Sequence, residues 1–259
     1  MLDSGRASGA SLVLKGDSKV FKLISLILFF FTALVNAQTP PDPSTLLKNA
    51  VAYHDPDGAF LQSKVKLVLA ETGPNNRNRE TTIVFDFPNS VFHASSKNDG
   101  RVIEYIVQND SAVVKIDGST DISEEDKKKF RIRPNRAQFM RNYYAYLYGL
   151  PMKLDDPGTI IDPEIKKTQY DGKDVFALKV TYEAEVGGDT WYFYFDVSSS
   201  AMVGYRFYHD ESKNDGEYIT LAGEATAGKF RLPKTRKWYM HQDDKFLGTD
   251  EIVKFEIIR

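Results

Sequence analysis

Alternation of apolar and polar residues with a period of two is the feature that most constrains the fold of this chain. It recurs in about eleven short runs from residue 60 onward. In the first run Val65, Leu67 and Leu69 alternate with Lys64 and Lys66, the pattern of a strand with one buried face. The turns between runs are short, and antiparallel strands tolerate short connections, whereas parallel strands need a crossover of about a dozen residues or more. The sequence therefore predicts a mainly β fold with helices, of the α+β class, built on an antiparallel meander.

A short helix is expected before the first strand. Ser44 is a good N-cap residue, and the apolar positions that follow it fall at helical spacing: Leu46, Leu47, Ala50 and Val51. A second helix is expected over 134–150, between the two sets of strands, with Pro134 near its start and Gly149 at its end.

The second helix is aromatic on much of its circumference. One stripe combines Phe139, Tyr143, Tyr146, Leu147 and Leu150, and a second combines Met140, Tyr144 and Tyr148. A helix with so little polar surface is expected to be surrounded by protein. Two hypotheses fit: a core helix beneath a curved sheet, or a lid in the mouth of an incomplete barrel, with Gly149 and Pro151 as its hinge. The charged stretch just before it, at 122–130, is interpreted as a solvated turn of helix and not as a binding patch.

The N-terminal segment has the pattern of a cleavable secretory signal. Lys19 and Lys22 precede a short apolar run at 23–35, and small residues follow up to Ala37. Cleavage there would leave a mature chain beginning at Gln38, which we expect to be periplasmic or secreted without stable membrane insertion. Residues 1–37 would then be extension and signal peptide, with Val20 as the hypothetical true initiator. Residues 38–44 would be a flexible linker and 45–259 one domain with a helical insertion at about 120–150.

Charge and composition limit the classes of partner and of catalytic site that are expected for this chain. The 259-residue chain has no cysteine and a formal net charge of −2, without a long basic run. Nucleic acid is therefore not an expected partner, because phosphate backbones bind clustered Lys and Arg. Hydrolase signatures such as G-x-S-x-G and H-E-x-x-H are absent, as is a glycine-rich phosphate loop, and no cofactor is predicted.

Histidine beside carboxylates provides the weak case for a metal. His54, Asp55 and Asp57 lie within four positions, and imidazole with carboxylates can hold a divalent ion. The same residues form a good turn sequence, in which the histidine satisfies backbone groups after the helix. A metal-dependent hydrolase using these three residues is accordingly an alternative hypothesis, and no metal site is predicted.

The chain resembles two families. The aromatic strand pair at 191–208, the N-terminal helix and the long meander are similar to the bacterial lipoprotein carrier and outer-membrane lipoprotein-sorting family. That resemblance implies an incompletely closed β-barrel around one or more helices, with acyl chains carried in the hollow. The sequences AVAYHDPDGAF and FMRNYYAYLYGLPMKLDDPGT also resemble an uncharacterised family of exported bacterial proteins, for which no activity is implied.

These expectations combine into one candidate site. Tyrosine tolerates an aqueous side better than phenylalanine, so the Trp191 face of its strand is assigned to the interior. The predicted ligand-binding residues of cavity and lid are Phe85, Phe87, Tyr143, Leu147, Leu150, Trp191, Phe193 and Phe195. The function predicted from them is an exported binding or carrier protein for an apolar ligand, such as an acyl chain or a lipidated protein. A non-catalytic envelope interaction protein with a filled barrel is the remaining alternative.

Overall fold

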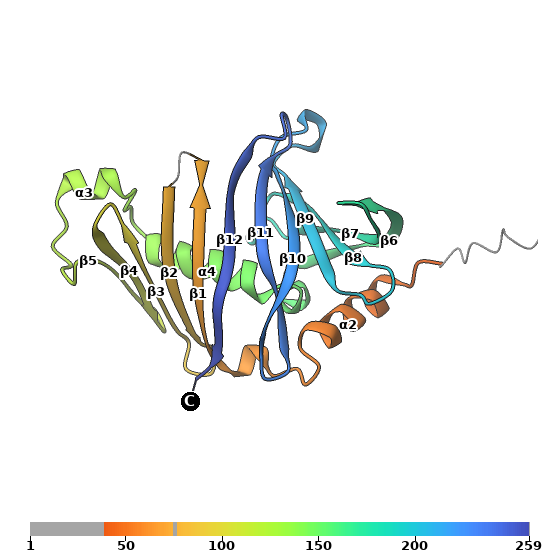
Figure 1. The fold of residues 1–259 in the computed structure, drawn as a ribbon, viewed down its shortest axis with the longest axis horizontal. Coiled ribbons are helices and arrows are strands. Elements are labelled where there is room, and N and C mark those ends of the chain that lie inside the picture. The colour runs from red at the N-terminus through yellow and green to blue at the C-terminus, as the bar shows by residue number, and fades with distance from the viewer. Residues whose placement is uncertain (1–38, 75–76, 259) are drawn as a thin grey trace, which may run out of the picture. The chain divides into compact units, whose positions relative to one another are not determined.

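The computed structural model describes residues 39–74 and 77–258, so the predicted signal peptide, its cleavage site and Val20 lie outside the described residues. Twelve strands form one antiparallel sheet in the order β5-β4-β3-β2-β1-β12-β11-β10-β9-β8-β7-β6. The sheet curls without closing, because β5 and β6 are its two edges (Figure 1). The predicted antiparallel, incompletely closed barrel is thereby confirmed. The strands are β1 (Lys64–Gly73), β2 (Arg77–Asp86), β3 (Val91–Asn98), β4 (Arg101–Gln108), β5 (Ser111–Ile116), β6 (Thr159–Tyr170), β7 (Lys173–Tyr182), β8 (Thr190–Asp196), β9 (Met202–Tyr208), β10 (Glu217–Ala227), β11 (Phe230–Met240) and β12 (Phe246–Ile257).

The strand missing from the sequence prediction is β6. It is an edge strand, most of its residues are exposed, and its register shifts between Ile161 and Ile165, around Pro163. Proline cannot donate a ladder hydrogen bond and is tolerated at edges and bulges. A strand of this kind has no buried face to impose alternation, so the period-two pattern is lost.

The inner face of the sheet is the core face. Val65, Leu67 and Leu69 of β1 are buried, and their partners across β2 lie on the same face. On β8 the inner residues are Trp191, Phe193 and Phe195, as predicted: the two phenylalanines are fully buried in the main core, and the tryptophan is half-buried against it. Alternation along each strand therefore points one set of side chains to the concave side.

The helices are α2 (Pro43–His54), α3 (Glu124–Lys129) and α4 (Arg136–Gly149), with 3₁₀ turns η1 (Phe60–Gln62), η3 (Met152–Asp155) and η4 (Glu211–Lys213). The N-cap of α2 is Asp42 and not Ser44 as predicted. The Asp42 carboxylate accepts a hydrogen bond from the Thr45 backbone N–H at 3.0 Å, and the Ser44 hydroxyl donates to the same carboxylate at 2.6 Å. A carboxylate at this position also complements the partial positive charge of the helix start.

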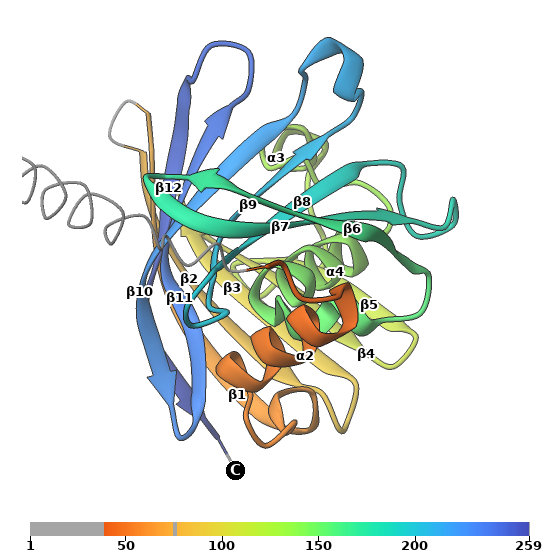
Figure 2. The ribbon, with the colours of Figure 1, turned by 90° about the vertical axis from the view of Figure 1, so that its right-hand side faces the viewer.

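Helix α4 lies on the concave side, between the β3–β5 half of the sheet and the β6–β9 half (Figures 1 and 2). Its buried face consists of Ala137, Met140, Tyr144, Leu147 and Tyr148. The helix is therefore rotated from the prediction: the second stripe, together with Leu147, faces the core. Phe139 and Tyr143 of the first stripe are 47% and 39% exposed.

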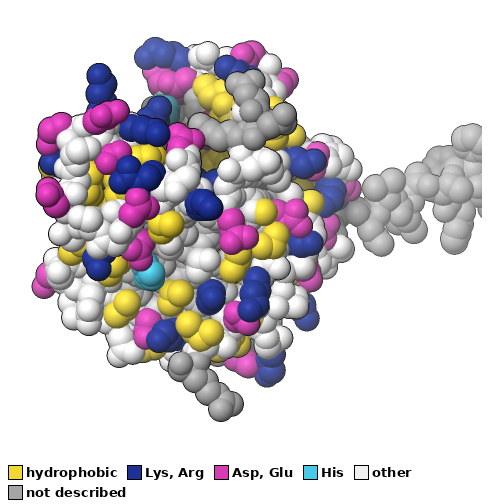
Figure 3. Space-filling model, turned by 60° about the vertical axis from the view of Figure 1, so that its left-hand side comes forward, with side chains coloured by type: hydrophobic (Ala, Val, Ile, Leu, Met, Phe, Trp, Pro, Cys, Tyr) yellow, Lys and Arg dark blue, Asp and Glu magenta, His cyan; other side chains and the backbone are white. Residues whose placement is uncertain are grey.

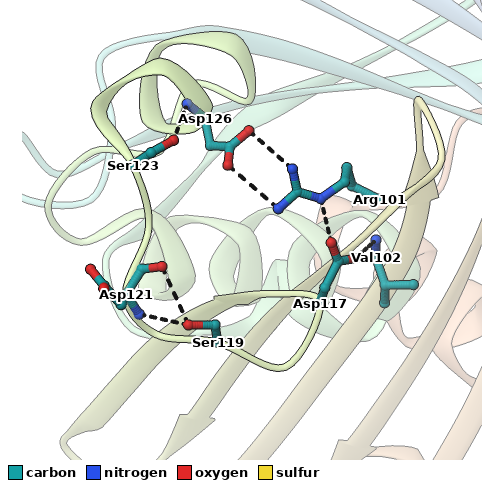
Figure 4. Close-up of polar contacts among 7 residues, drawn as sticks. All are labelled: Arg101, Val102, Asp117, Ser119, Asp121, Ser123 and Asp126. Carbon is teal, nitrogen blue, oxygen red and sulfur yellow. Dashed lines mark hydrogen bonds and ion pairs between the residues drawn. The ribbon is translucent and has the colours of Figure 1, made fainter.

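The segment between β5 and α3 is fixed to β4 by ion pairs. Arg101 at the start of β4 pairs with Asp117 and, at 3.4 Å, with Asp126 of α3 (Figure 4). The Asp117 carboxylate also accepts from the Val102 N–H at 2.8 Å. Ser123 caps α3 by accepting from the Asp126 N–H at 3.1 Å. These contacts fix the position of α3 at the β5 edge.

A second, smaller core lies on the outer face. Tyr170 stacks on Tyr194 with ring centroids 4.0 Å apart, and Val175 and Ala177 are buried beside them. The Tyr170 ring crosses Gly204, and its hydroxyl donates to the Ile219 carbonyl at 2.9 Å. On the face seen in Figure 3, acidic and basic side chains are interspersed among hydrophobic and uncharged ones.

Candidate functional site

A row of aromatic rings lines the concave side where the sheet is open. Tyr146 of α4 lies 5.4 Å from Trp191 of β8, which lies 4.7 Å from Phe207 of β9, centroid to centroid. Phe139 and Tyr143 continue the row along the same face of α4, with their rings 6.3 Å apart. These five residues and Tyr182, whose hydroxyl is hydrogen-bonded to that of Tyr146, are termed the aromatic mouth. All six rings keep contact with solvent, which is unusual for such a concentration of apolar surface.

Charged side chains occupy the same concave side, on the central strands. Glu71 of β1 stands opposite Arg79 of β2 on one side and opposite Asp250 of β12 on the other. Arg79 donates two hydrogen bonds to the Glu71 carboxylate, one of them from its Nε at 2.7 Å. On β11, Trp238 donates its indole N–H to Asp250 at 2.9 Å. Together with Arg236 these four residues are termed the inner polar network.

Asp250 is held in an environment that favours its neutral form. Burial raises the pKa of its carboxyl to about 6, and the nearby Glu71 charge acts in the same direction. The Trp238 hydrogen bond and the positive charges of Arg236 and Arg79 oppose the rise in this pKa without cancelling it. A carboxyl that titrates near neutral pH in a concave, aromatic environment is a property typical of functional sites.

The raised pKa of Asp250 predicts a stability that falls as the pH rises. Between about pH 4 and pH 6 the unfolded chain has released this proton while the folded chain still binds it. Each increase in pH within this range therefore favours unfolding. Allowing for partial solvent access, we expect a loss of about 2 kcal/mol that levels off above about pH 7. Asp250→Asn should abolish this drop in denaturation curves recorded across the range. Glu251→Gln, on the opposite face of β12 and paired with Lys234, is the matched control and should preserve it.

Arg236 is the one arginine in the described ranges that is fully buried. Its guanidinium lies 4.2 Å from the centre of the Tyr148 ring and donates to the carbonyls of Pro233, at 2.9 Å, and Leu147, at 3.3 Å. Within residues 39–74 and 77–258, neither its Nε nor the buried hydroxyl of Tyr205 has a hydrogen-bond partner. Buried polar atoms are almost always hydrogen-bonded, so these two atoms are exceptions within the interior.

Seven of the eight candidate residues predicted from the sequence lie in or against the buried interior: Phe85, Phe87, Leu147, Leu150, Trp191, Phe193 and Phe195. Trp191 is also part of the aromatic mouth, as is the eighth candidate, Tyr143. A Tyr143 stripe facing the core would contact Phe85 and Phe87, but no ring contact joins Tyr143 to either of them in the described part of the chain. The ring of α4 on that side is Tyr144, which lies 6.3 Å from Phe92, itself 5.3 Å from Phe85. The rotation of α4 accounts for the difference.

The inner polar network was missed by sequence reasoning, although one signal was available. Glu71 continues the inward parity of Val65, Leu67 and Leu69, so period two alone directs its carboxylate to the core side. Arg236 and Asp250 are found only from the pairing of β11 with β12.

The three candidate metal ligands are engaged separately. His54 bonds the Arg231 carbonyl through Nδ1 at 2.6 Å and accepts from the Met202 N–H through Nε2 at 3.0 Å. Burial lowers the pKa of this histidine, in keeping with a neutral ring that bridges two backbone groups. Asp55 accepts from the N–H groups of the turn that follows it, and Asp57 pairs with Lys229 at 2.8 Å. Within residues 39–74 and 77–258, no three His, Cys, Asp or Glu residues are placed to share a metal ion.

Comparison with known proteins relates the chain to other sequences and structures. Residues 20–254 match a family of unknown function (DUF6503). No curated protein sequence matches. Similar solved structures include a LolA superfamily protein from Nitrosomonas europaea, with a TM-score of 0.48, 10% identity and coverage of 85% of this chain and 95% of that one.

Two further structures are similar over most of their length. One is described as an outer membrane lipoprotein-sorting protein domain from Vibrio parahaemolyticus, with a TM-score of 0.45, 12% identity and coverage of 82% of this chain and 91% of that one. The other is a DUF1329 family protein from Desulfovibrio piger, with a TM-score of 0.44, 10% identity and coverage of 84% and 94%. The resemblances predicted from sequence, to an uncharacterised family and to lipoprotein-sorting proteins, are confirmed. At these identities and TM-scores the likeness concerns the path of the chain and not an activity.

Proposed function

The chain belongs to the DUF6503 family, whose function is unknown, and we propose that it is an exported carrier that holds an apolar ligand, such as an acyl chain, on the concave side of its sheet. The aromatic mouth is the observation that supports this proposal. Phe139 and Tyr143 are the most exposed of its rings, yet they belong to a helix that the sheet surrounds on two sides. Apolar ligands bind concave surfaces that are mostly apolar and carry a few polar groups. The aromatic mouth and the inner polar network have that composition.

In this proposal α4 occupies the place of the ligand in the empty protein. Leu147 and Tyr148 fill the interior beneath the mouth, where they are 3% and 1% exposed. Gly149 and Pro151 would allow α4 to swing while the strands stay in place. Ligand and helix would then compete for one apolar surface, so binding would be coupled to displacement of α4.

Leu147→Ala tests this competition. The substitution removes contacts of the closed state, so it should lower the free energy of unfolding by about 2–3 kcal/mol while raising the affinity for a fatty acid. Thermal denaturation and a fluorescent fatty-acid displacement assay measure the two quantities. Leu46→Ala, at an equally buried leucine of α2, should reduce stability without a gain in affinity. If Leu147→Ala weakens binding in step with stability, α4 is core and not a lid.

Dense packing of the interior supports a second candidate function. Leu147, Leu150, Phe193 and Phe195 are all almost fully buried by protein, as expected of a filled barrel in a non-catalytic envelope interaction protein. Mass spectrometry of a lipid extract from the purified protein separates the candidates, because only a carrier co-purifies with acyl chains.

Location is a separate part of the proposal. No helix in the described ranges has the length and apolarity needed to cross a bilayer. We expect the mature protein in the periplasmic or secreted fraction, with Gln38 as its first residue by N-terminal sequencing. Recovery in the membrane fraction with residues 23–35 still attached would contradict it.

A further inference from the structure

A strongly basic hollow of about 380 Å³ opens where α3 leads into α4. Its lining consists of Lys127, Lys128, Arg131, Ile132, Arg133 and Arg136. Five of these six side chains are cationic and none is acidic. Helix α3 and the start of α4 lie together at the β5 end of the sheet, as Figure 1 shows. These six residues are termed the basic hollow.

Most of these charges lack a counter-charge in the described part of the chain. Lys127 pairs with Glu124 at 2.6 Å, but no carboxylate of residues 39–74 or 77–258 lies within 4.0 Å of the charged nitrogens of Lys128, Arg131, Arg133 or Arg136. Within the same ranges, the buried Nε of Arg136 has no hydrogen-bond partner. Like charges gathered around one hollow repel each other, and an anion placed among them relieves that repulsion.

The backbone adds to the positive potential. Arg131 and Asn135 both adopt the left-handed region, at φ 55° and 60°, which turns the chain sharply before α4 begins. Asn135 is the N-cap of α4, yet its side chain makes no hydrogen bond to the first turn. The Asn135 side chain thus supplies no acceptor to the positive end of the 14-residue α4 dipole, which lies beside Arg133 and Arg136.

The basic hollow is continuous with the aromatic mouth. The guanidinium groups of Arg133 and Arg136 lie 5.5 Å and 5.0 Å from the centre of the Phe139 ring. Phe139 in turn stacks on Tyr143, with an interplanar angle of 12°. Cationic groups therefore give way to exposed aromatic rings along one face of α4, from its first residue toward the interior.

We infer that the ligand is an amphiphile with a phosphate-bearing head, which binds in the basic hollow while its tail follows Phe139 and Tyr143 into the aromatic mouth. The inference rests on the carrier function proposed above and specifies the ligand class. Arginine binds phosphate oxygens through paired N–H donors, and the adjoining lysines supply further charge. The stretch 122–130, interpreted from sequence as a solvated helix, thus contributes Lys127 and Lys128 to a binding surface.

Calorimetric titration with three probes tests the inference. Dodecyl phosphate carries head and tail, dodecyl maltoside carries the same tail with a neutral head, and inorganic phosphate carries the head alone. The two dodecyl probes are titrated below their micellar concentrations, and inorganic phosphate over the same range, into the wild type and into Arg133→Gln/Arg136→Gln. Lys166→Gln/Lys167→Gln on β6 removes the same charge from exposed positions and is the matched control. Circular dichroism verifies that each variant is folded.

We expect dodecyl phosphate to bind the wild type at least about tenfold more tightly than either other probe, as expected when hydrogen bonds to a charged group are gained. The arginine double variant should lose that preference while keeping its affinity for dodecyl maltoside, and the lysine double variant should change neither affinity. If the wild type binds both dodecyl probes equally, or if the arginine double variant loses equal affinity for both, the inferred phosphate-bearing head is wrong. The proposed carrier function is unaffected by either result. Inorganic phosphate binding as tightly as dodecyl phosphate also overturns it. Failure of both dodecyl probes to bind overturns the carrier function itself.

Discussion

Phe193→Asp should lower the free energy of unfolding by roughly 3–5 kcal/mol, the largest effect expected of any substitution considered for this protein. Phe193 is fully buried on the inner face of β8, against Leu178 of β7 and Tyr205 of β9. An aspartate there loses the packing of an aromatic ring and buries a charge. Urea denaturation at neutral pH measures the loss.

Tyr192→Asp is the control for this substitution, one residue away on the opposite face. The Tyr192 hydroxyl donates to Glu211 at 2.6 Å, and the ring remains partly exposed. Its replacement should cost only about 1 kcal/mol, because an outward aspartate remains hydrated. Equal losses at both positions would show that the outer face of β8 is as deeply covered as the inner one.

Gly204→Val should destabilise the protein by about 3 kcal/mol, although valine favours strands. A Cβ at this position would fall well inside van der Waals contact with the Tyr170 ring, which lies across the strand. The ring cannot move aside freely, because it stacks on Tyr194 and its hydroxyl is bonded to the Ile219 carbonyl. Thermal denaturation should therefore show a lower midpoint.

Two further variants isolate the steric cause. Gly188→Val, where no atom lies within 4 Å of an added Cβ, should change stability by less than about 0.5 kcal/mol. Combining Gly204→Val with Tyr170→Ala removes the obstruction, so the double variant should lose less than the sum of the two single losses. Strict additivity would show that the clash is not the cause.

Most of the strands could be predicted from the sequence because burial on one face imposes alternation. The pattern of Val65, Leu67 and Leu69 in β1 is of this kind, and the inward face of β8 followed from the preference of tyrosine for water. Edge strand β6 was not predicted, because neither of its faces is buried enough to impose an alternation of apolar and polar residues. The cap of α2 was misplaced by two residues, since Asp42 and Ser44 are both good caps and only the path of the chain decides between them.

The candidate site was predictable only in its apolar part. Large buried residues such as Phe85, Phe193 and Leu147 are recognised from their own strand or helix. The inner polar network is different, because Glu71 meets Asp250 through the pairing of β1 with β12, which no local pattern encodes. The rotation of α4 could not be predicted from its own sequence either, because both of its aromatic stripes are apolar enough to face the core. The second stripe is buried because Tyr148 contacts Arg236 and Tyr144 contacts Phe92, and both partners lie far away in the sequence.

The pairing of β1 with β12 also affects how the chain folds. Val65 is paired in register with Ile257, so the centre of the sheet joins the first strand to the last. Contacts of such long sequence separation slow folding, because the intervening loop must close before they stabilise anything. A chain emerging from a ribosome or a translocation channel cannot complete its sheet until the last strand is free. Until then β1 and β11 each present an unpaired central edge, which other chains can join, so the folding period is when this protein is most exposed to aggregation.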